Sequence, residues 1–508
     1  MQQGNDALQA LLARLARPEW SAVDAAREPG HSVAPNPDAL LLLPPNQRAE
    51  TLCRQLWAGR SLADAPGAQR QRLLESKPLL LATARELLGQ PSGDDLRKAA
   101  ALPIRLLNTQ YQLEVAAVHG GGIKGFGIDP LGSYTIAALD TLFELLLAYW
   151  HHHLPPPERL WNEAHALYQL ACLKGMDTPG GAPRDPTAEE IRSAYLKPQL
   201  MGSLNPARHR PAEIRQIATF VDRNAERAQL DGADGLLCID PESARPPAYS
   251  SGRPAPGCWR LCVRGLVQAL DQDAAALAPR LKQDLGRYWT RRQVRSELHR
   301  RTAQASRVTV GLEAVHQLLT GCGDDDSLLE HLTPLVPAPA MARHYATAMA
   351  ARCIDRSSTG AGFRLESVAR DTVLPGTFIA AFIGDEPDCR LGLIRWVRKD
   401  ADSGTTAGAQ WLLPGPQPCA VQRIEPSQAT PLLRAFVRCD GADGELVAPS
   451  GIFQPNDRVA IHTGDGWLSA ALTTLRESTF HVARFDLRVE CDHRREVAAG
   501  VPGVNQSG

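Results

Sequence analysis

The sequence predicts an α+β protein, in which a helical N-terminal region precedes an antiparallel β-barrel and a second, degenerate β-barrel-like domain. The first observation is the helical spacing of apolar residues in the first half, as at Leu8, Leu11, Leu12 and Leu15. The second is a change of pattern from Arg307 onwards, where glycines and prolines separate short apolar runs. A length of 508 residues allows about two to four domains.

The first half is expected to form a helical domain over residues 1–240. Asp129-Pro130 is a typical helix start, and the prolines at 155–157 are a typical helix stop. The segments with the clearest helical spacing lie near 66–89, 94–118, 130–153 and 157–174.

A stretch rich in proline, glycine and serine, 241–257, is typical of a loop or linker. Beside it, Leu236–Ile239 and Trp259–Val263 are short apolar runs that suit the strands of a small hairpin, and 264–298 has helical spacing. Residues 241–298 are therefore expected to comprise a linker, a short hairpin and a connecting helix.

Strand patterns dominate the rest of the chain. Val308, Val310 and Leu312 alternate as in a half-buried strand. Further strands are predicted at Phe363–Leu365, Thr377–Ile383, Arg390–Arg398, Ala409–Leu413, 432–438, 457–462, 468–476 and 481–489. This spacing favours antiparallel barrels or sandwiches. We assign 299–416 to a first barrel, 417–492 to a second β domain and 493–508 to a disordered tail.

Composition argues against several classes of function. Lys and Arg number 55 against 56 Asp and Glu, so the formal charge of −1 does not suggest general binding of DNA or RNA. The eleven cysteines include no CxxC pair, which favours reduced thiols and a cytoplasmic protein.

Membrane segments are not expected either. The first residues lack the basic start and apolar run of a signal peptide. The most apolar segment, Thr135 to Trp150, contains Asp140 and Glu144 and is short for a bilayer, so it is expected to be a buried helix rather than a membrane span.

The most informative local motif is Asp355-Arg-Ser357-Ser-Thr-Gly360, followed by Ala-Gly362 and an alternating strand. Asp and Ser side chains can accept hydrogen bonds from nearby backbone amides, and glycines permit positive φ and the close approach of a ligand. A carboxylate and a hydroxyl held at the start of a strand also suit the donor-rich edge of a guanine. An ordinary turn explains many occurrences of this pattern.

The surrounding residues strengthen the motif, because the region of about 300–415 resembles the PilZ domain family in content and order. Leu374-Pro-Gly376-Thr-Phe-Ile resembles the glycine and strand that follow the family's DxSxxG motif. Arg390-Leu-Gly-Leu-Ile-Arg-Trp396 resembles its central strand, and Gly408-Ala-Gln-Trp-Leu resembles its last strand. The resemblance covers about a fifth of the chain.

This resemblance implies a six-stranded barrel that binds cyclic di-GMP, frequently as an intercalated dimer of the nucleotide. It also implies that Asp355, Ser357 and Gly360 line the guanine site. In the family, arginines of a preceding RxxxR motif contact the phosphates and the guanine faces. Arginine suits this role because its planar fork can hold a phosphate bidentately, grip guanine O6 and N7, or stack on the base.

The chain departs from the family pattern upstream of the motif. It places Arg300-Arg301 before a strand that is expected to start at Arg307, and a strict RxxxR lies earlier, on a predicted helix whose basic face could simply be solvated. The interval before Asp355 is long, and its insertion is expected to form an extra helix. The candidate ligand-contacting arginines, in order of preference, are Arg300, Arg301, Arg307, Arg291 and Arg295, and the extra helix is expected near Asp324 to Leu335.

Two other motifs are assigned structural roles. Gly120-Gly-Gly122-Ile-Lys-Gly125 formally matches GxGxxG, but the pattern before it is helical, so a loop between helices is expected. His151–His153 lie at a predicted helix end, where cations interact favourably with the helix dipole. Three consecutive imidazoles cannot all face one metal ion from a helix, so no metal site is expected.

The functional prediction is a bacterial, cytoplasmic cyclic di-GMP receptor that couples this second messenger to an unknown protein partner through its helical region. No cofactor is expected, and the sequence contains neither GGDEF nor EAL, which favours a receptor over an enzyme that makes or degrades the messenger. One alternative is a PilZ-like adaptor that no longer binds nucleotide. The other is an enzyme with an active site around His119–Asp129.

Overall fold

The structure is a computed structural model, and the chain divides into two compact units, Met1–Val294 and Arg295–Gly508. The structure describes residues 2–15, 37–61, 66–90, 96–124, 128–176, 188–230, 235–250, 257–272, 277–291, 300–320, 348–366, 373–384, 386, 389–399, 404–412, 415–424 and 431–492. The helix expected near Asp324 to Leu335 and the tail expected at 493–508 lie outside the described residues.

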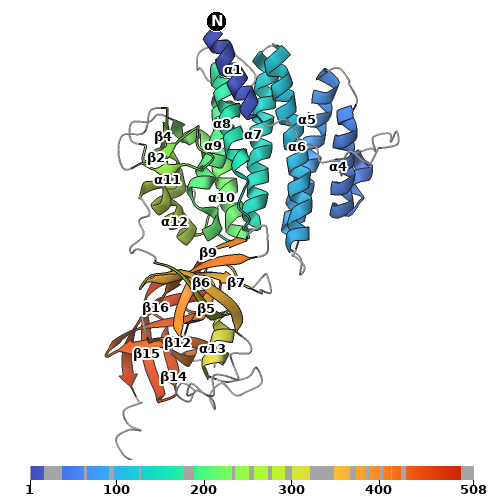
Figure 1. The fold of residues 1–508 in the computed structure, drawn as a ribbon. Coiled ribbons are helices and arrows are strands. Elements are labelled where there is room, and N and C mark those ends of the chain that lie inside the picture. The colour runs from blue at the N-terminus through green and yellow to red at the C-terminus, as the bar shows by residue number, and fades with distance from the viewer. Residues whose placement is uncertain are drawn as a thin grey trace, which may run out of the picture. The chain divides into compact units, whose positions relative to one another are not determined.

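The first unit is mainly helical, as predicted (Figure 1). Its helices are α1 (Gln2–Arg14), α3 (Pro37–Leu41), α4 (Pro45–Ser61), α5 (Pro66–Gly89), α6 (Leu96–Lys124), α7 (Ile128–His151), α8 (Glu158–Leu173), α9 (Ala188–Ser203) and α10 (Pro211–Asn224). One local prediction was wrong. The glycines at 120–122 were expected in a loop, but α6 continues through them to Lys124. Adding residues to a long helix that has already formed costs less free energy than starting a new one.

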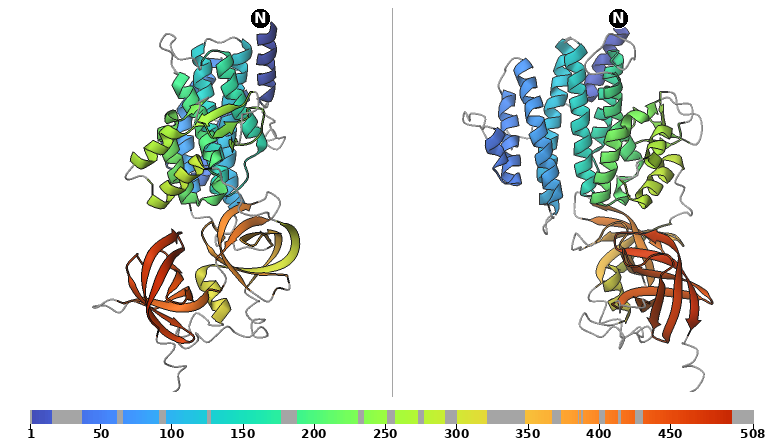
Figure 2. Two further views of the ribbon diagram at one scale, coloured as in Figure 1. Left: turned by 90° about the vertical axis from the view of Figure 1, so that its left-hand side faces the viewer. Right: turned by 180° about the vertical axis from the view of Figure 1, so that it is seen from behind.

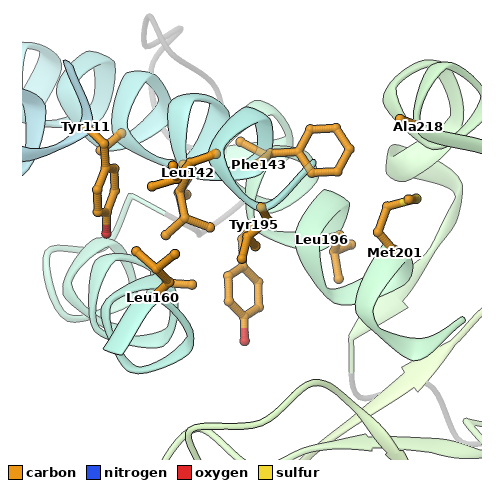
Figure 3. Packing of buried hydrophobic residues seen from close by; sticks show 14 of the residues in the cluster. Tyr111, Leu142, Phe143, Leu160, Tyr195, Leu196, Met201 and Ala218 are labelled. Atoms are coloured by element: carbon orange, nitrogen blue, oxygen red, sulfur yellow. The ribbon is translucent and has the colours of Figure 1, made fainter. Parts of the chain in front are cut away.

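The core of this unit is built around α7, which packs against α6, α8, α9 and α10. Figure 3 shows Leu142 of α7 near Leu160 of α8, and both side chains are fully buried. Among the described helices, α7 alone is long and apolar enough to cross a membrane, and 72% of that stretch is buried inside the protein. This burial agrees with the expected core helix.

A small four-stranded sheet and two further helices complete the first unit. They are β1 (Gln229–Leu230), β2 (Leu237–Ile239), β3 (Ala248–Tyr249), β4 (Trp259–Cys262), α11 (Arg264–Gln272) and α12 (Pro279–Thr290). The strands β2 and β4 pair antiparallel, as expected. Two helices replace the single helix expected at 264–298. Leu261 and Trp289 belong to the same apolar core as the helices, so this segment packs as part of the helical unit.

The second unit begins with a closed antiparallel barrel of six strands. They are β5 (Arg300–Val310), β6 (Met349–Arg356), β7 (Gly360–Leu365), β8 (Phe378–Ile383), β9 (Arg390–Lys399) and β10 (Thr405–Trp411), in the closed order β10-β7-β6-β5-β8-β9. Alternate residues fill the interior, for example Val308, Cys353 and Phe363, which are completely buried.

A second closed barrel follows at once. Its strands are β11 (Gln417–Arg423), β12 (Leu433–Asp440), β13 (Asp443–Pro449), β14 (Arg458–Thr463), β15 (Gly466–Ser478) and β16 (Val482–Asp492). Its closed order is β11-β12-β13-β16-β15-β14. If the strands of each barrel are numbered one to six, both barrels follow the order six-three-two-one-four-five. The second barrel is therefore a complete copy of the topology of the first.

The predicted strands were found in both barrels, but the strand starts were less accurate. The first strand was expected to begin at Arg307, whereas β5 begins at Arg300 and Arg307 lies inside it. Leu312 was expected to continue this strand, but it begins the helix α13 (Leu312–Thr320). The change of direction occurs at Gly311, whose φ of 105° is accessible to glycine at little energetic cost.

The helix α13 lies between the two barrels, as the left view of Figure 2 shows. Val315 and Leu318 of α13 share one apolar cluster with Phe378 of the first barrel and Phe436 of the second, and the two phenylalanine rings stack at 4.8 Å. The barrels thus share a core. The imidazole of His316 is completely buried. Its Nε2 atom lies 3.1 Å from the Cys419 carbonyl oxygen, within hydrogen-bond distance.

Ion pairs also join the barrels. Arg395 of β9 donates to both carboxylate oxygens of Glu477 in β15, at 3.0 Å from Nη2 to Oε2. Arg484 of β16 donates to the same carboxylate and also pairs with Glu445 at 2.6 Å. These side chains are at most 21% exposed, so this chain of charges is screened less than an ordinary surface pair.

Candidate functional site on the first barrel

The DxSxxG motif forms the bend between β6 and β7. Asp355 lies near the end of β6, and Gly360 is the first residue of β7. The Ser357 amide donates to the Gly360 carbonyl at 2.8 Å, and the Thr359 amide donates to the Ser357 hydroxyl at 3.3 Å. The hydroxyl therefore stabilises the bend from within, while Ser358 and Thr359 are exposed at its tip. The bend is thus open to solvent at the rim of the barrel.

Two of the candidate arginines lie beside this bend. In the pairing of β5 with β6, Arg301 is opposite Asp355 and Arg300 is opposite Arg356. Directly opposed residues in an antiparallel pair have Cβ atoms about 5 Å apart. Arg300 and Arg301 are exposed. The structure therefore places a carboxylate, a hydroxyl and guanidinium groups together, although 54 residues separate Arg301 from Asp355 in the sequence.

Arg356 is a further cation at this rim, which the sequence analysis missed. Its Nη1 atom donates to Glu386 Oε1 at 2.6 Å and is 3.3 Å from the side-chain oxygen of Gln304. Arg390 approaches the same glutamate at 3.8 Å. Arg356 is the second residue of the DxSxxG motif. A basic residue at this variable position was the sequence feature that could have identified it as part of the site.

Glycines form the outer surface of the barrel next to the bend. A Cβ atom at Gly362, which pairs with Asp355, would lie 2.8 Å from the Asp355 carboxylate oxygen Oδ1. A Cβ atom at Gly408, which pairs with Trp396, would overlap the Trp396 indole. Glycine at these two positions lets the Asp355 carboxylate and the Trp396 indole lie close against the barrel wall.

The other predicted arginines are not at this bend. Arg307 lies six residues along β5 from Arg301, where it pairs with Ala350 and Phe382 and lines a groove of about 750 Å³. Arg291 belongs to the first unit, where it follows the last residue of α12 as its C-cap. Arg291 is thus not inside the helix that was predicted to carry it. Arg295 lies outside the described residues.

The site shows no sign of nucleophilic or metal chemistry in its described residues. Burial raises the pKa of the nearest thiol, Cys353, to about 11, and this thiol donates to the Asp355 carbonyl from the barrel interior. Among the residues that the structure describes, no group of three His, Cys, Asp or Glu side chains is arranged to hold a metal ion.

Comparison with known proteins finds similarity to a cyclic-di-GMP receptor. Residues 38–234 match the family model described as "Cyclic-di-GMP receptor FimW, N-terminal domain". The chain is also 22% identical over 421 residues to the cyclic-di-GMP receptor FimW of Pseudomonas aeruginosa, in an alignment that covers 66% of this chain and 68% of that protein. The family match lies in the helical region and not in the barrel that resembles PilZ domains.

Proposed function

We propose that this chain is a non-enzymatic receptor for cyclic di-GMP and that its first barrel, a PilZ-type barrel, binds the nucleotide. The observation that carries the proposal is the pairing of Arg301 with Asp355 at an exposed rim. Similarity to the receptor FimW supports the ligand class, because the family match covers much of the helical region and the alignment with FimW covers 66% of the chain.

The chemistry of the rim fits the ligand. Asp355 and Ser357 offer oxygen acceptors for the N–H groups of a guanine edge. Arg300 and Arg301 offer planar, always charged forks to the two phosphates. Binding would neutralise these arginines and order them against the bend, so that the ligand favours one arrangement of the preceding segment over another.

Calorimetric titration with cyclic di-GMP tests this proposal. The wild-type chain should bind saturably. An Arg300→Ala/Arg301→Ala variant should lose more than about 100-fold in affinity, since each charge-assisted hydrogen bond contributes roughly 1.5–3 kcal/mol. Arg488→Ala, which removes an exposed arginine of the second barrel, is the matched control and should bind normally. Equal binding by the double variant would move the contacts to Arg291 or Arg295. Absence of heat with the wild type would favour a nucleotide-free adaptor.

A further inference from the structure

Two half-buried cysteines share one face of the small sheet in the first unit, where β2 and β4 lie side by side (Figure 1). Cys238 of β2 is directly opposite Arg260 of β4, and Cys258 stands two residues before Arg260. Because alternate residues of an extended chain point to the same face, the two cysteines are diagonal neighbours. Leu237 and Leu261, which pair on the opposite face, are almost completely buried. The cysteines therefore belong to the outward face of the sheet.

The thiols are close enough to affect each other. Burial raises the pKa of the Cys238 thiol, and the adjacent Cys258 thiol raises it further. Arg260 acts in the opposite direction and Asp240 in the same direction as Cys258. An influence of one uncharged thiol on the proton of another requires the two side chains to be neighbours. This agrees with the diagonal placement that the strand register gives.

A disulfide bond between the two cysteines requires only a small local movement. Diagonal neighbours in an antiparallel pair are about 7–8 Å apart, whereas the Cα atoms of a disulfide are about 4.4–6.8 Å apart. Cys258 precedes Trp259, the first residue of β4, so that its backbone is not held in the ladder. The residue before it, Gly257, is exposed and has a φ of 87°, which glycine adopts at little energetic cost. Cys258 can therefore approach Cys238 without breaking a pair of the sheet.

A comparison with a second pair of cysteines shows why solvent access matters. Cys419 in the second barrel also has a neighbouring thiol, that of Cys439, but Cys419 is completely buried. A soluble oxidant cannot reach it without opening the barrel. The outward face of the small sheet carries a third thiol, Cys262, opposite Gln229 of β1. Among the residues that the structure describes, no group of three His, Cys, Asp or Glu side chains is arranged to hold a metal ion. The outward pair is therefore better suited to a reaction between two thiols.

We propose that Cys238 and Cys258 form a reversible disulfide when the chain meets hydrogen peroxide. First, one thiolate attacks a peroxide oxygen and the O–O bond breaks. This gives a sulfenic acid and a hydroxide, which takes up the proton that the thiol lost and becomes water. The second thiol then attacks this sulfur, the S–S bond forms and the S–O bond breaks, which releases a second water. Two thiols are oxidised and one peroxide is reduced. A dithiol reductant reverses the reaction by exchange.

The bridge would close the segment that holds helix α1. Arg14, the last residue of α1, donates to the Pro241 carbonyl oxygen and, at 2.9 Å, to Glu242. Both acceptors lie between the two cysteines in the chain. A cross-link at the ends of this segment restricts its conformations, so it should hold the α1 anchor more firmly against the sheet. Both cysteines belong to the first unit, and the reaction does not depend on the nucleotide site proposed for the first barrel.

Peptide mapping of the full chain tests the bridge directly. Trypsin does not cut before proline, so Arg245 and Arg253 stay intact and one peptide, 228–260, carries both cysteines but not Cys262. The reduced chain is treated with hydrogen peroxide, and the remaining thiols are then alkylated. We expect this peptide to carry no alkyl group and to be two hydrogens lighter than its reduced form. Dithiothreitol should restore both thiols.

Serine variants identify the partners. Cys238→Ser and Cys258→Ser should each abolish the bridged peptide, whereas Cys262→Ser, on the same face, should form it like the wild type. Circular dichroism confirms that each variant is folded. The site would be overturned by a disulfide to Cys262 instead, by bridges between two chains, by separate oxidation of each thiol to sulfinic acid, or by no reaction.

Amide hydrogen exchange tests the effect on α1. Exchange in α1 should slow severalfold when the wild type is oxidised, because local opening of the anchored helix becomes less frequent. The Cys262→Ser variant should behave in the same way, and Cys258→Ser should show no change on treatment with peroxide. Equal exchange in the oxidised and reduced wild type would overturn the role of the bridge in holding α1.

Discussion

The two barrels of this protein share one strand order but differ in how they use charge. In the first, Arg300 and Arg301 open the first strand beside a three-residue bend, and exposed arginines face each other on the outer wall. In the second, the corresponding strand begins with Gln417, and the corresponding hairpin turns at Gly441 between two aspartates. Each barrel has its own apolar interior.

The comparison distinguishes residues that a barrel needs for folding from residues that are available for binding a ligand. Both interiors are apolar and filled by alternate residues, so this feature belongs to folding. The arginines beside the carboxylate of Asp355 occur only on the first barrel, at a position where the second barrel has Gln417 and Pro418 within the described strands. The second barrel instead supplies a covering surface for β8 and β9. Under the function proposed above, the first barrel carries the ligand chemistry and the second barrel supports it.

The largest effect is expected from Phe436→Ala, which removes a ring from the core shared by the barrels. Truncation of a completely buried phenylalanine lowers the free energy of unfolding by about 3–5 kcal/mol. Because Phe436 packs on Phe378, both barrels should lose stability together, and chemical denaturation should show one transition for this unit. Phe363→Ala, inside the first barrel, is the control. Separate transitions for the two barrels in either variant would show that the shared core does not couple them.

The next largest effect is expected on the affinity for cyclic di-GMP, when one aspartate is removed from each barrel in turn. Asp355→Ala should weaken binding of cyclic di-GMP by about 1.5–3 kcal/mol, because it removes a charged acceptor at the bend. Asp443→Ala, at the hairpin of the second barrel, should leave the affinity unchanged. Calorimetry on both variants measures the difference. A loss in Asp443→Ala as large as that in Asp355→Ala would contradict the division of roles between the barrels.

Acid should weaken the junction between the barrels through His316. Burial lowers the pKa of this imidazole to about 4, so the folded state keeps it neutral while the unfolded chain takes up a proton near pH 6.5. The unfolded state therefore binds more protons between these values, and stability falls as the pH decreases from about 6.5 to about 4. Between about pH 7.5 and pH 5 the loss should be about 2 kcal/mol.

His316→Gln should remove this pH dependence of the second unit, which denaturation curves at several pH values can measure. His462→Gln is the control, because that ring is only partly buried and its pKa is also lowered by burial. We expect the slope of stability against pH to change less in this control. An identical slope in wild type and His316→Gln would mean that other groups govern the acid sensitivity.

The smallest effects compare surface arginines and should have opposite signs. Arg352→Gln removes one of two like charges at directly opposed positions, Arg352 and Arg364, and should raise the free energy of unfolding by about 0.2–1 kcal/mol. Arg458→Gln removes an exposed ion pair with Glu490 and should lower it by a similar or smaller amount. Thermal denaturation at low and high salt measures both. Loss of stability in Arg352→Gln would show that the Arg352 side chain stabilises the barrel.

Local features of the fold could be predicted because neighbouring residues decide them. The helices at 66–89 and 157–174 follow from apolar spacing, and they match α5 and α8 closely. Most strands were found by alternation. The strands β6, β11 and β13 were missed, because runs such as Met349–Arg356 mix charged and small residues in a way that shows alternation only when the partner strands are known.

By itself, the sequence determined the order of a helical region and a β region, the bend from Asp355 to Gly360 and the basic residues upstream of it. These follow from short-range sterics and hydrogen bonding, which the residues carry with them. Only the tertiary structure decided that Arg301 faces Asp355, that Arg352 is opposite Arg364, and that α13 lies between two barrels of equal topology. Closure of a barrel sets the register between strands that are distant in the chain, and register depends on all strands at once.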